Sequence, residues 1–79
     1  MKDRVIFRKW ANGDIIAFLP DNEASTGMVD TYEHVGQYGE GSPEEVYDTQ
    51  PARPQEYQPL LDELTSLGYD LRVMKRYNR

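Results

Sequence analysis

Residues 5–19 read VIFRKWANGDIIAFL, and the pattern of this segment predicts the central element of the fold. Two runs rich in β-branched and aromatic residues, 5–10 and 14–19, flank Asn12-Gly13, which is the strongest short signal for a β-hairpin. A type I′ turn needs positive φ at both central residues, and Asn and Gly tolerate that conformation. The sequence therefore predicts that the first twenty residues fold back on themselves.

A two-residue loop would fix the register of these strands. It would oppose Trp10 with Ile15, Phe7 with Phe18, and Ile6 with Leu19. One face of the hairpin would then hold Val5, Phe7, Ile16 and Phe18, and the other would hold Ile6, Trp10, Ile15 and Leu19. Because one layer of helix covers only one face, the second must be covered by loops or a short helix, by a second copy or a partner protein, or by a small molecule.

Three further elements follow along the chain. The alternation in Met28–Tyr38 predicts a third strand, and Ser42-Pro43-Glu44-Glu45 has the pattern of a helix start, with Pro51 ending that short helix. The clearest helix carries an apolar stripe and ends near Gly68. The stripe consists of Tyr57, Leu60, Leu61, Leu64 and Leu67.

Two proline positions leave the start of this longer helix open. It begins at Pro54 with a kink at Pro59, or a separate first turn precedes a helix that begins at Pro59. A last strand is expected over Leu71–Tyr77. The resulting order, β-β-β-α-α-β, indicates one α+β domain over residues 1–79, in which a helix packs on one face of a two-layer, mainly antiparallel, four-stranded sheet.

Composition narrows the class of protein. The chain has no cysteine, which excludes disulfides and Cys-based zinc sites, and no apolar run near the length of a membrane span. No signal-peptide pattern follows Met1, so we expect a cytoplasmic protein. No calcium-loop spacing or phosphate-binding glycine motif is present, so we expect no metal and no cofactor.

Charge is distributed unevenly along the chain, whose net charge is −5. Eight of the nine basic residues lie near the two ends, while residues 10–71 hold thirteen acidic residues and one arginine. If the last strand lies beside the first, the basic residues at the two ends would form a ridge that could bind nucleic acid. Alternatively, these basic residues form ion pairs with acidic residues of the protein itself. The ridge would consist of Arg4, Arg8, Arg72, Lys75 and Arg76. The acidic middle is a solvated face or a mimic of a phosphate backbone.

His34, the only histidine, is the one candidate for catalysis. Glu33 and His34 are adjacent on a predicted strand and so point to opposite faces, which separates the obvious dyad. A structural histidine or a binding contact is the alternative, and a small hydrolase centred on His34 is the weakest hypothesis. We expect no enzyme and no small-molecule substrate.

Two regions give the chain a family resemblance. The first comprises Val5–Trp10, Gly13–Pro20 and Tyr32–Gln37, and the second is Glu56–Val73. Together they resemble short, mostly uncharacterised proteins of bacteriophages and mobile elements of gut bacteria. The resemblance implies an accessory protein in the cytoplasm of a bacterial host, and by analogy a host-defence inhibitor such as an anti-CRISPR.

The sequence thus predicts a non-enzymatic interaction protein that binds a macromolecular partner or itself, as a homodimer, with nucleic-acid binding as the alternative. The predicted partner-binding residues are Ile6, Arg8, Trp10, Ile15, Leu19, Tyr32, His34 and Tyr38.

Overall fold

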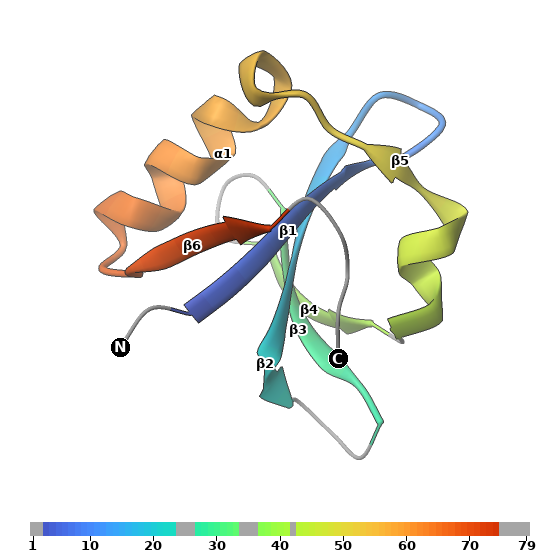
Figure 1. Ribbon diagram of the computed structural model, residues 1–79, viewed down its shortest axis with the longest axis horizontal. Helices are drawn as coiled ribbons and strands as arrows, with labels where there is room; N and C mark the ends of the chain where they lie inside the picture. Colours follow the sequence, from blue (N-terminus) through green and yellow to red (C-terminus); the bar gives the residue numbers. More distant parts are fainter. Residues whose placement is uncertain (1–2, 24–26, 34–36, 42, 75–79) are drawn as a thin grey trace.

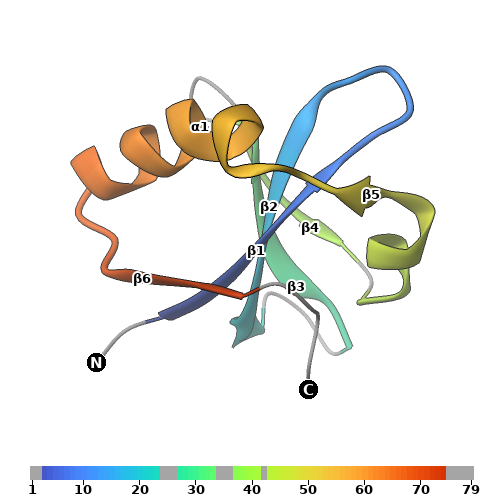
Figure 2. The same ribbon diagram turned by 45° about the horizontal axis from the view of Figure 1, so that its top comes forward.

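An antiparallel hairpin forms the centre of the α+β fold, which Figures 1 and 2 show in a computed structural model. The structure describes residues 3–23, 27–33, 37–41 and 43–74. Its strands are β1 (Asp3–Lys9), β2 (Ile15–Glu23), β3 (Val29–Glu33), β4 (Gln37–Gly41), β5 (Gln50–Pro51) and β6 (Leu71–Met74). A 3₁₀ helix, η1 (Pro43–Asp48), and one α-helix, α1 (Pro54–Ser66), complete it.

The strands form one sheet, in the order β4-β3-β2-β1-β5, and β6 also pairs with β1. Every pair is antiparallel except β1 with β6, which is parallel. The expected α+β class and mainly antiparallel sheet are therefore present. The predicted number of four strands is wrong, because the expected third strand is a hairpin of β3 and β4, and β5 was not anticipated.

The predicted register of the first hairpin is wrong by one residue. The Trp10 N–H donates to the Asp14 carbonyl at 2.8 Å, and the Gly13 N–H donates to the Trp10 carbonyl at 2.9 Å. Three residues, 11–13, therefore form the loop, with Gly13 at φ +95°, as in three-residue hairpins that end on a left-handed glycine. The Asn12 side chain accepts the Asp14 N–H at 3.0 Å, which supports this turn.

The shift of one residue moves each side chain of β2 to the other face of the hairpin. In the structure Ile6 opposes Phe18 and Phe7 opposes Ala17. One core cluster lies beneath α1 and consists of Val5, Phe7, Ala17, Leu19, Tyr32, Leu60 and Leu64. The other lies on the opposite face and consists of Ile6, Ile16, Phe18, Val29 and Val46.

Val46 of η1 belongs to the second cluster, so the short helix covers the face that a single helix layer leaves open. Both figures place α1 and η1 on opposite sides of the central hairpin. Beside η1, a Cβ atom at Gly41 of β4 would meet the end of the Glu45 side chain, which can move aside, and would lie 3.3 Å from the Thr31 methyl group. The covering of the second face is thus intramolecular.

The outer edge of β1 is shared by two short strands. β6 pairs with residues Asp3 to Ile6, and β5 pairs with Arg8 and Lys9. The Ala52 N–H donates to the Phe7 carbonyl at 3.2 Å, between the two pairings. β5 therefore limits the length of β1 that is available to β6, and the predicted strand over Leu71–Tyr77 is described only as far as Met74.

Helix α1 begins at Pro54 and continues through Pro59, so it is the longer of the two alternatives. At its end the Gly68 N–H donates to the Thr65 carbonyl at 3.0 Å and the Tyr69 N–H to the Leu64 carbonyl at 3.2 Å. With Gly68 at φ +103°, this is a Schellman motif, as expected for a glycine at that position. The motif turns the chain back toward β6.

We predict that Val46→Ala lowers the free energy of unfolding by about 2 kcal/mol, because two buried methyl groups of the second cluster are lost. Tyr47→Ala is the matched control in the same helix, since the Tyr47 side chain is 78% exposed, and we expect a change below about 0.5 kcal/mol. Urea denaturation measures both. Equal stability of the two variants would show that η1 does not cover this face.

Candidate functional site

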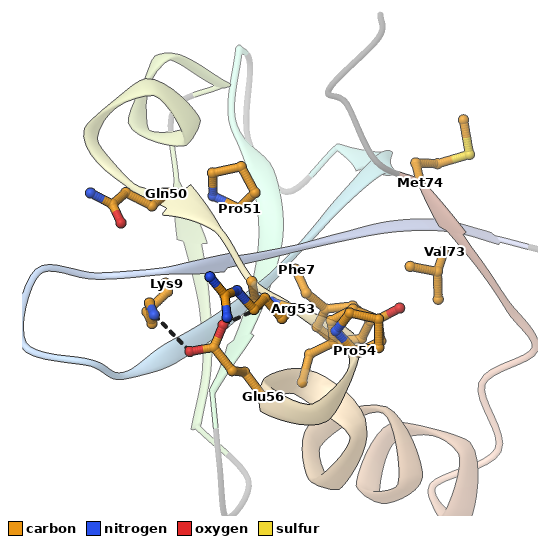
Figure 3. Close-up of a pocket in the computed structure, with 11 residues that line it drawn as sticks. Phe7, Lys9, Gln50, Pro51, Arg53, Pro54, Glu56, Val73 and Met74 are labelled. Atoms are coloured by element: carbon orange, nitrogen blue, oxygen red, sulfur yellow. Dashed lines mark hydrogen bonds and ion pairs between the residues drawn. The ribbon is translucent and has the colours of Figure 1, made fainter.

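A cavity lies where β5, the first turn of α1 and the end of β6 meet beside β1 (Figure 3). Its volume of about 550 Å³ is within the range of ligand pockets, roughly 300–1,000 Å³. It lies where two pairings along the same edge of β1 end, that of β6 at Ile6 and that of β5 at Arg8. Its lining consists of Phe7, Lys9, Gln50, Pro51, Ala52, Arg53, Pro54, Glu56, Tyr57, Val73 and Met74.

Two stacked rings form the apolar part of this cavity. Phe7 of β1 and Tyr57 of α1 have ring centroids 4.5 Å apart and planes 9° from parallel. Phe7 is buried and Tyr57 half-buried, and both belong to the cluster beneath α1 or pack against it. Val73 adds an exposed apolar side chain from β6, on the side of the strand that faces α1 in Figure 3.

The charged part of the lining is held by an ion pair. The Lys9 ammonium lies 2.6 Å from the Glu56 carboxylate, and the side chains of the two residues are 30% and 27% exposed. The other Glu56 oxygen accepts the Arg53 backbone N–H at 2.9 Å, which also caps α1. The Lys9 hydrogen bond, and secondarily the Arg53 N–H, hold the pKa of Glu56 below its usual value.

The ion pair reduces the basicity of Glu56. A carboxylate whose pKa is lowered by two donors is a weak base, so Glu56 is poorly placed to take a proton near neutral pH. In the described residues, no group of three His, Asp or Glu side chains is arranged to hold a metal ion. The described helices also include none long and apolar enough to cross a membrane.

The structure does not gather the predicted partner-binding residues on an open surface. Ile6 and Leu19 are each 1% exposed, so the prediction that they contact a partner is wrong. They lie on opposite faces of the hairpin, because the register differs from the expected one. Trp10 and Ile15 are half-buried, and likewise lie on opposite faces.

Tyr32 is also buried, and its hydroxyl donates to the Glu63 carboxylate of α1. It joins β3 to the helix and cannot reach a partner. His34 lies outside the described residues, as does the side chain of Tyr38, so their predicted roles stay predictions.

Arg8 has a structural role within the molecule. Its guanidinium donates to the Thr49 hydroxyl at 2.9 Å and to the carbonyls of Val46 and Thr49 at 2.9 and 2.6 Å. These acceptors lie at and just after the end of η1, so Arg8 fastens the 3₁₀ helix to β1. Partial burial lowers the pKa of this guanidinium, which nevertheless stays protonated.

The other cations of the predicted basic ridge are placed differently. Arg4 holds the Asp21 carboxylate with its Nε at 3.0 Å and its terminal nitrogen at 2.7 Å, and its hydrogen bonds lower the pKa of Asp21. Arg72 pairs in register with Arg4 and is exposed. Lys75 and Arg76 lie outside the described residues. For Arg4 and Arg8, pairing within the protein is therefore the reading that the structure supports.

Few features of the sequence indicate this cavity. Tyr57 belongs to the predicted apolar stripe of the helix and was expected to be core. Val73 and Lys9 were assigned to strands without a role. The available signal was Pro51 and Pro54, which lie at the end of β5 and the start of α1, but these prolines do not specify which strand edge the segment meets.

We predict that Arg8→Ala lowers the free energy of unfolding by about 2 kcal/mol, because it leaves partly buried acceptors of η1 without their charged donor. Arg72→Ala, which removes an exposed arginine, should change it by less than about 0.5 kcal/mol. Thermal or urea unfolding measures both. If Arg8→Ala were as stable as wild type, Arg8 would not attach η1 to β1. The guanidinium would then be a surface cation that could contact a partner.

We predict a pH-dependent effect of Glu56→Gln. Because the folded-state pKa of Glu56 lies below its ordinary value of 4.5, the ionised carboxylate stabilises the fold above pH 4.5, and this contribution is lost as the pH falls through the folded-state pKa. Glu56→Gln should therefore be less stable than wild type at pH 7, with the difference shrinking below pH 4.5.

Urea denaturation across this pH range measures the effect, and Lys9→Met should show the same trend, because Lys9 is the main cause of the shift. A stability difference that is independent of pH would contradict the ion pair as its source.

Comparison with known proteins adds no homologue from which a role could be carried over to the cavity. The chain matches no protein-family model, no curated protein and no solved structure. The resemblance to short phage and mobile-element proteins therefore stays a prediction, and any function must be argued from the geometry of this chain.

Proposed function

We propose that this protein is a binding module that holds a short segment of a partner protein in the cavity between β5, α1 and β6. The observation that carries the proposal is the composition of the lining: a stacked Phe7–Tyr57 pair and exposed Val73, bordered by the fixed Lys9–Glu56 pair. Apolar walls with a few positioned polar groups are typical of binding pockets.

The energetics also favour binding at this place. An apolar side chain of a partner could replace water against the Phe7 and Tyr57 rings and Val73, with a gain of roughly 25 cal/mol per Å² of apolar surface buried. The polar groups at the border would set its orientation. Since Lys9 and Glu56 already bind each other, they need not reorganise when a partner arrives.

A protein segment suits the site better than a compact small molecule because the cavity lies along the edge of the sheet. Extended segments commonly bind beside sheet edges, with one side chain in a pocket. The proposal keeps the predicted class of function, an interaction protein, and replaces the hairpin face by the cavity as the contact surface.

The test is selection of binders from a displayed library of random peptides, followed by measurement of their affinities. We expect wild type to enrich peptides with a large apolar residue, and Val73→Glu to bind them at least about tenfold more weakly, because a charge would be placed in an apolar lining. Leu67→Glu is the control, since Leu67 is 52% exposed at the far end of α1.

Backbone amide NMR shifts of the wild-type protein supply a measurement that does not depend on the folding of Val73→Glu. The enriched peptides should shift amides of β5 and the first turn of α1. No enriched peptide, or shifts confined to other elements, would refute the proposal.

A further inference from the structure

A second hollow adjoins the cavity at the tip of the hairpin. It has a volume of about 470 Å³ and is lined by Lys9, Trp10, Asp48, Gln50 and the loop residues 11–13. Lys9 and Gln50 line both spaces and are paired in register across β1 and β5. The two hollows therefore meet at these two side chains and extend along the segment 48–53.

Opposite charges mark the two ends of this segment. Asp48 lines the second hollow, and Arg53 lines the cavity. Both are exposed, and within the described part of the chain neither forms a salt bridge. The Lys9–Glu56 pair is neutral overall, and Arg53 also interacts electrostatically with Glu56 without forming a salt bridge. The groove thus has a negative end, where half-buried Trp10 also lies, and a positive end.

The length of the segment sets the spacing of these charges. Asp48 and Arg53 are five residues apart in the chain, which spans at most about 17 Å. An extended peptide of about five residues has a similar length. In an extended peptide, residues 1, 3 and 5 project from the same face. Three side chains of such a peptide could therefore meet the groove together.

We propose that the two hollows form one groove for an extended peptide that carries a basic residue, an apolar residue and an acidic residue at alternate positions. The apolar side chain enters the cavity against Phe7 and Tyr57. The basic side chain lies at Asp48 and the face of Trp10, and the acidic side chain lies at Arg53. This inference rests on the proposed function and specifies the partner's chemistry.

Three synthetic peptides with blocked ends test the charge pattern, with cores Lys-Ser-Leu-Ser-Asp, Lys-Ser-Leu-Ser-Lys and Asp-Ser-Leu-Ser-Asp. Affinities are measured by NMR titration at low ionic strength, where exposed charges are least screened. We expect wild type to prefer the mixed-charge peptide about three- to five-fold, the effect of one exposed charge pair.

Charge reversal in the protein should change this order. Arg53→Glu leaves two negative ends and should favour the doubly basic peptide, whereas Asp48→Lys leaves two positive ends and should favour the doubly acidic one. Asp62→Lys is the control, because Asp62 is exposed on α1 and does not line either hollow. It should retain the wild-type preference.

The outcomes separate this inference from the proposed function. Equal affinity for all three peptides, unchanged orders in both reversed variants, or failure of all three while library peptides still bind in the cavity would overturn the charge pattern alone. If no library peptide binds in the cavity either, the proposed function fails as well.

Discussion

Two backbone hydrogen bonds of Trp10, one to the Asp14 carbonyl and one from the Gly13 N–H, set the register of the central hairpin, and this register determines how both faces of the sheet are packed. With three residues in the loop, Ile16 and Phe18 share a face with Ile6, which η1 covers through Val46. With two residues in the loop, each side chain of β2 would change face. A difference of one residue at the turn thus determines which side chains form each of the two cores.

Three successive residues of β1 then connect the hairpin to its surroundings. Phe7 stacks on Tyr57 of α1, Arg8 binds the carbonyls at the end of η1, and Lys9 pairs with Glu56. Alternation along the strand sends the first and third of these side chains toward α1 and the second toward η1. β1 therefore binds both helices that cover the sheet, α1 on one face and η1 on the other. It also supplies Phe7 and Lys9 to the cavity lining.

Short sequence patterns predicted individual strands and helices, whereas the cavity is formed by pairing between segments that are far apart in the sequence. The hairpin and the helix that ends just before Gly68 follow from turn chemistry and periodicity. The pairing of the last strand with the first was only a condition of the basic-ridge hypothesis, and the structure shows this pairing. The register could not be predicted, since Asn12-Gly13 suits a two-residue turn as well as a three-residue loop that ends on glycine. The cavity could not be predicted from the sequence, because β5, which lines it, has only two residues and no strand-like pattern.

The same contacts that stabilise the fold also fix the shape of the groove. Near the start of segment 48–53, Arg8 binds the hydroxyl and carbonyl of Thr49. At its other end, the Arg53 N–H donates to Glu56, which Lys9 also binds. Anchored at both ends to β1, this segment has little conformational freedom to lose when a partner binds, which lowers the entropic cost of association. A site of this kind gains affinity from its rigidity. Removal of either the Arg8 guanidinium or the Lys9–Glu56 pair should therefore weaken peptide binding, although Arg8 does not line the groove.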